Sequence, residues 1–401
     1  MAIGTLVGGA MYAGVLVAGV TGALPHGVAG AAAVFGGVLL LAAPINAWWA
    51  FLRGLERQDL VYGIYAVSTV ALVVAVAVAV QHHPTVEEIF VIYVATFAFR
   101  LLATIAVVLM VAPVRLRLTR SAISSLAVAA PAVAGAYVLH EVDSHIDVVL
   151  LGFLVPANDV GSYAAAYRVI DAVTFLTAGA LSAATFPVFS RLARQAPDQI
   201  ERLYDRVVRS VTVALVPAVL VLVAVARPLM DLMFSFEDDH AARLVALLAP
   251  SSLLIAINFT TMYLALAVNR VGAAIASAGT AAAVNVSANL IAVPAIGVEA
   301  AAGATLLGEL VMVIAFAVAL RRGGFATHAG RSVVVAALAL VPPLVLAGAF
   351  PSRHVEFALM GIPYAVGMLV AGGLLRRADI RRLRAAVGRR AGSDRARDAG
   401  G

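Results

Sequence analysis

Long apolar stretches recur from one end of the chain to the other, and they constrain the fold more than any other feature. The hydrocarbon core of a bilayer is about 30 Å thick, and a helix of about 20 apolar residues crosses it. Twelve such spans are predicted, at 3–23, 28–52, 60–80, 88–112, 122–155, 161–190, 206–226, 241–268, 270–293, 299–320, 330–350 and 356–375. Apolar residues make up 63% of the sequence and charged residues 12%, against about 45–50% and about 25% in soluble domains. The chain is therefore predicted to be an all-α, polytopic membrane protein.

The positions of the arginines test this arrangement, because cytoplasmic loops collect basic residues. All 28 basic residues are arginine, and 23 of them fall in alternate loops or in the tail 376–401. This alternation predicts a protein of the cytoplasmic membrane with both termini in the cytoplasm. The tail is interpreted as an anchor on anionic membrane lipids, where each charge contributes about 1 kcal/mol. The net charge of +6 follows from this topology and does not indicate a nucleic-acid partner.

Missing residue types exclude several chemistries. The sequence has no cysteine, which excludes disulfides, thiolate nucleophiles and cysteine zinc sites. It has no lysine either, which excludes a Walker A nucleotide site and a Schiff-base lysine. The pairs His82–His83 and His140/His145 lack the spacing of a metal site, so no metal or cofactor is predicted. Any transport by this chain is predicted to proceed without ATP hydrolysis within it.

One arginine lies near the middle of a predicted span, where a charge costs about 2.5–3.5 kcal/mol on insertion scales. Arg100 shares one face of the helix predicted at 88–112 with Tyr93, Thr96 and Thr104, at spacings of three and four residues. No acidic residue lies within one turn of Arg100. A water-filled cavity or an anionic ligand is therefore the preferred explanation for this charge.

A second polar stripe follows the span predicted at 161–190. Tyr163, Tyr167, Asp171 and Thr174 fall in one sector of that helix. Arg168 lies beside the stripe and three residues from Asp171, within reach of an ion pair. Two interpretations stay open, because the same residues suit a structural pair with hydrogen bonds between helices or a functional site.

Polar residues also interrupt the neighbouring spans. Asp147 lies toward the outer end of 122–155, and Asn285 and Asn289 lie one turn apart in 270–293. Asn258 and Glu309 interrupt the spans 241–268 and 299–320. Hydrogen bonds between membrane helices are common, so helix packing explains Asn258, Glu309 and the two other asparagines when each is taken alone.

Several segments, in matching order, resemble a known family. Asp147-Val-Val-Leu-Leu-Gly-Phe, Val160-Gly-Ser-Tyr-Ala-Ala-Ala-Tyr-Arg168 and Thr185-Phe-Pro-Val-Phe-Ser-Arg-Leu192 are similar to the mid-chain signature of the oligosaccharide and polysaccharide flippases. The stretch from Asn289 to Ala304, followed by Glu309, resembles the motif N-x-x-L-I-P-x-x-G-x-x-G-A-A-x-A…E, with Glu299 in place of the usual small residue. These flippases belong to the multidrug/oligosaccharidyl-lipid/polysaccharide exporter superfamily.

The resemblance implies a MATE-like fold of two helix bundles that face each other across a central cavity. The bundles are expected at 1–120 and 121–375. The implied activity is not enzymatic: the protein would alternate between inward and outward states and move a polyprenyl-linked glycan across the membrane. The implied partners are the lipid-linked glycan, membrane lipids, and the glycosyltransferases or polymerase of the same pathway.

The resemblance also implies a role for the intramembrane polar residues. Arginine offers phosphate a planar, bidentate fork, so Arg100 and Arg168 are expected to contact the head group. Asp147 and Asp171 are expected to orient arginines or to couple an ion. Asn285 and Asn289 complete the expected substrate-binding residues.

The family usually has six helices in its first bundle, whereas only four spans are predicted before 122–155. This difference leads us to expect a start further upstream, with two more apolar spans.

Two other functions fit the same pattern less well. A multidrug exporter on the same fold would be expected to have a mid-membrane carboxylate in its first bundle, where this sequence has Arg100. A membrane-embedded glycan polymerase or glycosyltransferase would need paired catalytic acids in a large outer loop, and the longest predicted outer loop, 227–240, is too short. A scramblase-like or purely structural membrane protein is a further alternative.

Overall fold

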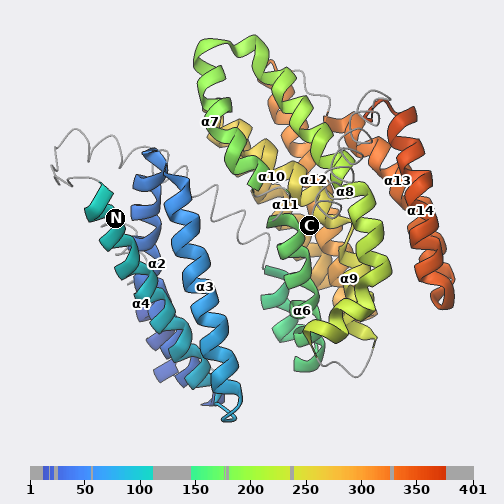
Figure 1. Cartoon of the computed structure of the whole chain (residues 1–401). Helices are drawn as coiled ribbons and strands as arrows, with labels where there is room; N and C mark the ends of the chain where they lie inside the picture. The colour runs from blue at the N-terminus through green and yellow to red at the C-terminus, as the bar shows by residue number, and fades with distance from the viewer. Residues whose placement is uncertain are drawn as a thin grey trace, which may run out of the picture. The chain divides into compact units, whose positions relative to one another are not determined.

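The structure is a computed structural model, and it describes residues 12–17, 19–21, 26–55, 57–111, 146–175, 177, 180–234, 239–325 and 329–375. Within these ranges the regular structure is helical throughout, as the sequence predicts (Figure 1). The chain divides into two compact units, residues 1–119 and 120–401. The tail 376–401, most of the predicted span 3–23 and most of 122–155 lie outside the described residues.

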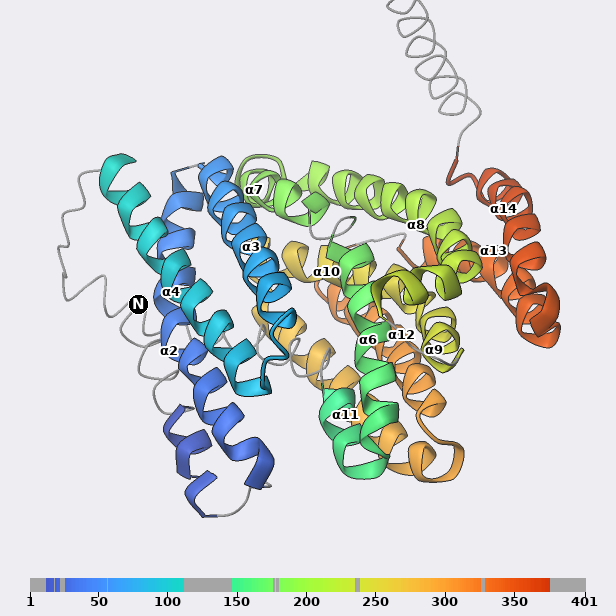
Figure 2. The ribbon, with the colours of Figure 1, turned by 60° about the horizontal axis from the view of Figure 1, so that its bottom comes forward.

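The first unit contains the helices α2 (His26–Gly54), α3 (Gln58–Val80) and α4 (Val86–Val111). They correspond to the predicted spans 28–52, 60–80 and 88–112. The three helices lie side by side, and α4 packs against both α2 and α3 (Figure 2). Leu52, Val61 and Val108, one from each helix, form a small buried core. This arrangement places the polar face of α4 against its two neighbours.

The second unit begins, in the described residues, with a helical stretch at 146–154. Nine α-helices follow in the described part of this unit: α6 (Ala157–Thr174), α7 (Ala180–Gln195), α8 (Pro197–Met233), α9 (His240–Leu248), α10 (Ser251–Ala267), α11 (Val271–Ile296), α12 (Glu299–Arg322), α13 (Ala329–Ala349) and α14 (His354–Ala371). Figure 2 shows two adjacent helix pairs, α11 with α12 and α13 with α14. Helix α10 packs between α8 and α12, and α6 packs against α9.

Eight helices of the described residues are long and apolar enough to cross a bilayer. They coincide with eight of the predicted spans, and α9 and α10 together account for a ninth, 241–268. The chain is therefore a multi-pass membrane protein. The bend of 43° between α9 and α10 falls at Pro250, whose ring cannot be accommodated in a straight helix.

Two predicted boundaries are wrong. The stretch 161–190 forms two helices, since α6 ends at Thr174 and α7 begins at Ala180. Near the break the Thr177 hydroxyl donates to the carbonyl oxygens of Val173 and Thr174, a type of bond that competes with the helical ladder. Helix α8 starts earlier than predicted and has 37 residues, which at about 1.5 Å each exceed the thickness of a bilayer. Its first turns, which carry Arg202 and Arg206, therefore extend beyond the apolar core.

Candidate functional site

The intramembrane arginine of the first unit is enclosed by aromatic rings. Arg100 on α4 is 7% exposed. Its guanidinium carbon lies 4.8 Å from the centre of the Tyr65 ring, 4.9 Å from Phe97 and 5.9 Å from Trp49. Its Nε donates a hydrogen bond to the Ser68 hydroxyl at 2.8 Å. Aromatic faces attract a cation and are worth about 2 kcal/mol or more each when water is excluded, so this site stabilises a charge that the bilayer disfavours.

Hydrogen bonds hold the residues around Arg100 in place on α2, α3 and α4. Trp49 on α2 donates its indole N–H to the Thr104 hydroxyl at 3.2 Å, and that hydroxyl donates to the carbonyl oxygen of Arg100 at 2.7 Å. Ser68 on α3 donates to the carbonyl oxygen of Tyr65 at 2.9 Å. The buried residues of α4 are Thr96, Arg100, Thr104 and Val108. The shared face that the spacing predicts for Thr96, Arg100 and Thr104 is therefore confirmed.

In the second unit a buried carboxylate joins three helical segments. Asp147, in the stretch 146–154, is fully buried. Its Oδ1 accepts the backbone N–H of Val148 at 2.8 Å. Its Oδ2 accepts the Tyr163 hydroxyl of α6 and lies 3.1 Å from the Thr305 hydroxyl of α12. The Tyr163 and Thr305 oxygens are 3.0 Å apart, so the three side chains form one compact network.

A second carboxyl lies on the next turn of α12. Glu309 is 3% exposed, and Asn258 on α10 is fully buried. The Asn258 side-chain N–H group donates to Glu309 Oε2 at 2.6 Å and to the Glu309 carbonyl oxygen at 2.9 Å. The Asn258 side-chain oxygen is buried and has no hydrogen-bond partner within the described ranges.

Two asparagines of α11 lie against the same part of α12. Asn289 donates to the side-chain oxygen of Asn285 at 2.8 Å and to its carbonyl oxygen at 3.0 Å. The Asn289 side-chain oxygen has no partner in the part of the chain that the structure describes. A Cβ atom at Gly308 would lie 3.2 Å from the Asn285 Cβ. The glycine therefore allows the helices to approach closely where the asparagines and Glu309 meet.

These side chains form one group, which we call the buried polar cluster. Tyr167 of α6 is 4% exposed and lies within electrostatic range of Asp147, Tyr163 and Glu309, and of the half-buried Asp171. The buried polar cluster comprises Asp147, Tyr163, Tyr167, Asn258, Asn285, Asn289, Thr305 and Glu309.

Arg168 occupies a different position from its neighbours on α6. The side chains before and after it, Tyr167 and Val169, are buried, whereas Arg168 is exposed. Arg168 therefore presents its charge on the surface of the second unit.

Four of the six site residues predicted from the sequence lie in or near the buried polar cluster of the second unit. Asp147, Asn285 and Asn289 belong to the buried polar cluster, and Asp171 lies within range of it. Arg100 lies in the first unit and Arg168 on the surface of the second. Whether the two arginines serve one ligand stays a prediction.

Sequence reasoning missed Thr305 and Ser68 and undervalued Asn258 and Glu309. A threonine or serine in a helix can bond to its own backbone, so neither residue signals a partner by itself. The spacing of Thr305 and Glu309, four residues apart on α12, was the available signal, because it places both on one face.

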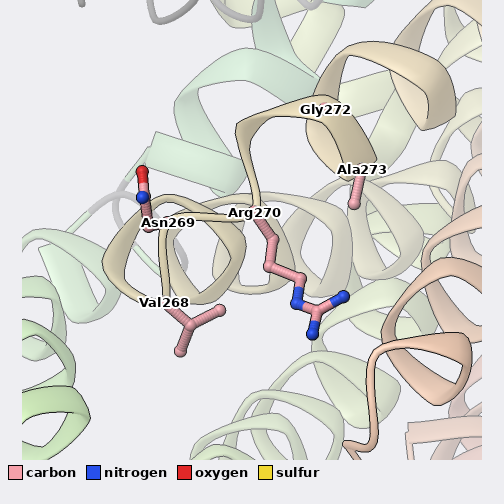
Figure 3. A pocket seen from close by; sticks show the side chains of 5 residues that line it. All are labelled: Val268, Asn269, Arg270, Gly272 and Ala273. Atoms are coloured by element: carbon pink, nitrogen blue, oxygen red, sulfur yellow. The ribbon is translucent and has the colours of Figure 1, made fainter.

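A surface hollow occurs at the turn between α10 and α11, with a volume of about 520 Å³ (Figure 3). It is lined by Val268, Asn269, Arg270, Gly272 and Ala273. Arg270 already donates to the carbonyl oxygen of Gly323 at 2.7 Å, at the end of α12. The hollow is therefore part of a helix-terminus contact and is not the candidate site.

Comparison with known proteins assigns the family. The family described as "Polysaccharide biosynthesis protein" matches residues 38–242, which is half of the chain. The chain belongs to this family. The match includes Arg100, Arg168 and the first three members of the buried polar cluster, Asp147, Tyr163 and Tyr167. A search of curated proteins finds no match.

Solved structures were compared with the fold of this chain. The structure titled "Lipid II flippase MurJ, inward closed conformation" is similar with a TM-score of 0.63 and 12% identity, over 91% of this chain and 82% of that one. A transporter of the MOP superfamily from Pyrococcus furiosus and an outward-facing MATE family transporter each give a TM-score of 0.42 at 13% identity, over 60% of this chain and 62% of theirs. The first likeness confirms a MurJ-like helical fold.

Proposed function

We propose that this protein is a flippase-type secondary transporter. Its cargo is a polyprenyl-(pyro)phosphate-linked oligosaccharide, which crosses the cytoplasmic membrane by alternating access during the synthesis of a surface polysaccharide or glycan. Membership of a polysaccharide biosynthesis family and a fold similar to that of a lipid II flippase support a transporter rather than an enzyme.

The environment of Arg100 is the observation that most directly supports the proposal. Its contacts in the described residues are one hydroxyl group and three aromatic rings, all of them neutral. A guanidinium held in this way is oriented but not neutralised, and its Nε is the only nitrogen with a hydrogen-bond acceptor among those residues. The remaining N–H groups suit a phosphate, which arginine binds in a bidentate manner.

Arg168 supplies the corresponding charge in the second unit. It is exposed, while the two buried tyrosines that precede it on α6, Tyr163 and Tyr167, hold the helix against the other members of the buried polar cluster. An arginine on a fixed helix can bind a phosphate group with little reorganisation.

Arginine substitutions test this proposal in vesicles that contain the purified protein and a labelled lipid-linked oligosaccharide. A charge-assisted hydrogen bond is worth about 1.5–3 kcal/mol, so Arg100→Ala and Arg168→Ala should each lower the translocation rate by about 10–100-fold. Arg100→Lys keeps the charge but loses the fork, and should recover only part of the rate.

The matched control is Arg243→Ala, because Arg243 is an exposed arginine on α9. Its rate should equal that of the wild type. Wild-type rates in both Arg100→Ala and Arg168→Ala would refute a phosphate contact at these residues.

A second candidate function, export of cationic compounds on the same fold, is favoured by one observation. The second unit buries two carboxyl groups, Asp147 and Glu309, and such groups attract cations. The same vesicles distinguish the two functions, because an exporter of cations would translocate a lipophilic cation and leave the lipid-linked oligosaccharide in place.

A further inference from the structure

The side chains of Glu309 and Asn258 form one of the two hydrogen bonds of an acid–amide pair. A carboxylic acid and a carboxamide side by side form two hydrogen bonds: the amide N–H donates to one acid oxygen, and the acid O–H donates to the amide oxygen. The first bond is present, from Asn258 Nδ2 to Glu309 Oε2 at 2.6 Å. The acceptor of the second, Asn258 Oδ1, is buried and has no partner among the residues that the structure describes.

The orientation of the Asn258 amide is set by its surroundings. Its Nδ2 lies near two oxygens of Glu309, the carboxyl Oε2 at 2.6 Å and the backbone carbonyl at 2.9 Å. If the amide group of Asn258 were turned by 180°, its oxygen would face the oxygens of Glu309, and the backbone carbonyl has no hydrogen to donate. The neighbouring groups therefore fix which side-chain atom of Asn258 is the nitrogen and which is the oxygen. An unsatisfied buried acceptor costs about 1–3 kcal/mol, and the missing group is a hydrogen-bond donor beside the carboxyl.

We propose that Glu309 is a proton-binding site, and that its proton is donated to Asn258 Oδ1. A proton on the carboxyl completes the acid–amide pair and supplies the donor that the amide oxygen lacks. It also removes a negative charge from the interior of a membrane protein, where a charged carboxylate is costly. The ligand of this site is therefore a proton, bound between α10 and α12.

The groups around Glu309 also favour the protonated form of its carboxyl group. The helices packed near it contribute Asp147, the phenols of Tyr163, Tyr167 and Tyr204, and the half-buried Asp171. All of these groups are neutral or acidic. Like charges in one apolar cluster disfavour each other's ionisation, so a proton on Glu309 lowers the repulsion with Asp147.

A line of hydroxyl groups leads away from this site. One turn from Asn258 on α10, the Thr261 hydroxyl is hydrogen-bonded to the Tyr204 hydroxyl of α8, with 2.7 Å between the oxygens. Beside these two hydroxyls lies a void of about 10 Å³, bordered by Val313, Phe316 and Leu320 of α12, which is room for a single water.

The void begins one turn beyond Glu309, because Val313 is four residues further along α12. Leu320 and Ala329 also line it, near the end of α12 that carries Arg321 and Arg322. Thr261 and Tyr204 border this void, so they are tested below as a route by which the proton of Glu309 exchanges with water.

The use of this proton to drive transport rests on the proposed function, whereas its binding does not. Infrared spectroscopy of the purified full-length protein in lipid vesicles tests the binding without any substrate. At neutral pH the wild type should show the carbonyl band of a protonated carboxyl group in an apolar environment, and the band should shift when H₂O is replaced by D₂O.

Two substitutions assign the band. Glu309→Gln should abolish it, since glutamine preserves the pair by donating its own N–H to Asn258 Oδ1 and so keeps the fold. Asp147→Asn, which changes the other buried acid, should retain it. A wild type without the band, or a band that survives in Glu309→Gln, would overturn the proposal whatever the outcome of the translocation assay.

Two further variants test the partner and the route. Asn258→Leu should shift the band to the frequency of a carboxyl group without a hydrogen-bonded partner, and an unchanged frequency would refute the pairing. Thr261→Val should slow the exchange of the carboxyl proton for deuterium several-fold, while its control Thr280→Val, an exposed threonine bonded only within its own helix, should not. Equal exchange rates in the two threonine variants would refute the route.

Discussion

Single side chains connect the helices of each unit, and they do so at positions where an unpaired polar group would be unstable. Ser68 holds the guanidinium of Arg100 across two helices of the first unit. Tyr163 plays the corresponding part in the second unit, where its hydroxyl lies between Asp147 and Thr305. In both units, therefore, a hydroxyl group on a neighbouring helix is hydrogen-bonded to an ionisable side chain. That side chain is a guanidinium in the first unit and a carboxyl group in the second.

We predict that Tyr163→Phe destabilises the protein by about 1–2 kcal/mol. The change removes one hydroxyl from a fully buried site and leaves Asp147 with one donor fewer. Hydrogen bonds to charged groups are worth about 1.5–3 kcal/mol in water-soluble proteins and less on average between membrane helices. The free energy of unfolding can be measured by detergent denaturation of the purified protein.

The control for this prediction is Tyr62→Phe, because Tyr62 is 48% exposed on α3. It should change the free energy of unfolding by less than about 0.5 kcal/mol. Equal effects of the two substitutions would show that the Tyr163 hydroxyl contributes nothing to stability.

The individual residues of the candidate site were only partly predictable. The face shared by Thr96, Arg100 and Thr104 follows from helical spacing, which is a local property. The partners of Arg100 and Asp147 lie on other helices, at separations of 32 residues for Ser68 and 158 residues for Thr305. No local pattern links such residues, and neither a serine nor a threonine is unusual enough to be singled out.

Helices of the second unit are held together by close contacts and by arginines at their ends. Arg270, at the start of α11, donates to the carbonyl oxygen of Gly323 beyond the end of α12 at 2.7 Å. Arg331 of α13 does the same for Gly372 beyond α14 at 2.8 Å. The last carbonyl groups of a helix lack partners within the helix and carry a partial negative charge, so a cation from the paired helix stabilises each pair.

We predict that Gly308→Leu destabilises the contact between α11 and α12 by about 1–3 kcal/mol. A Cβ at this position would already lie 3.2 Å from the Asn285 Cβ and 3.5 Å from the carbonyl oxygen of Ala281. The larger side chain must therefore separate the helices, and overpacking of this kind costs about 1–3 kcal/mol. The thermal unfolding temperature of the purified protein reports the effect.

The matched control is Gly303→Leu on the same helix, where a Cβ would meet nothing within 4 Å. Leucine has a higher helix propensity than glycine, by about 0.5–1 kcal/mol, so this variant should be as stable as the wild type or slightly more so. If Gly308→Leu unfolds at the same temperature as Gly303→Leu, the close approach of the helices is not needed for stability.

At the scale of the whole molecule, the alternation of arginines predicts which end of each helix faces the cytoplasm. The absence of cysteine makes this prediction easy to test, since every introduced thiol is unique. Arg322→Cys and Ser352→Cys place exposed thiols before and after α13.

We predict that an impermeant maleimide labels Ser352→Cys in intact cells but labels Arg322→Cys only after the membrane is opened. The positive-inside rule places the arginine-bearing end in the cytoplasm, and α13 is long enough to carry the chain to the other side. The cysteine-free parent protein gives the background. Labelling of both positions from outside would mean that α13 does not cross the membrane.

Composition and hydrophobic periodicity by themselves determined that this is an all-α, multi-pass membrane protein, and they located most of its helices, because a bilayer imposes one length and one polarity on every span. Only the tertiary structure decided where the spans break, as between α6 and α7, and which polar residues meet. Asn258 and Glu309 looked like ordinary packing residues when each was read within its own helix, and Thr305 was not singled out at all. They belong to one buried polar cluster because α10, α12 and the stretch 146–154 are brought together by packing between distant segments, which no single stretch of sequence encodes.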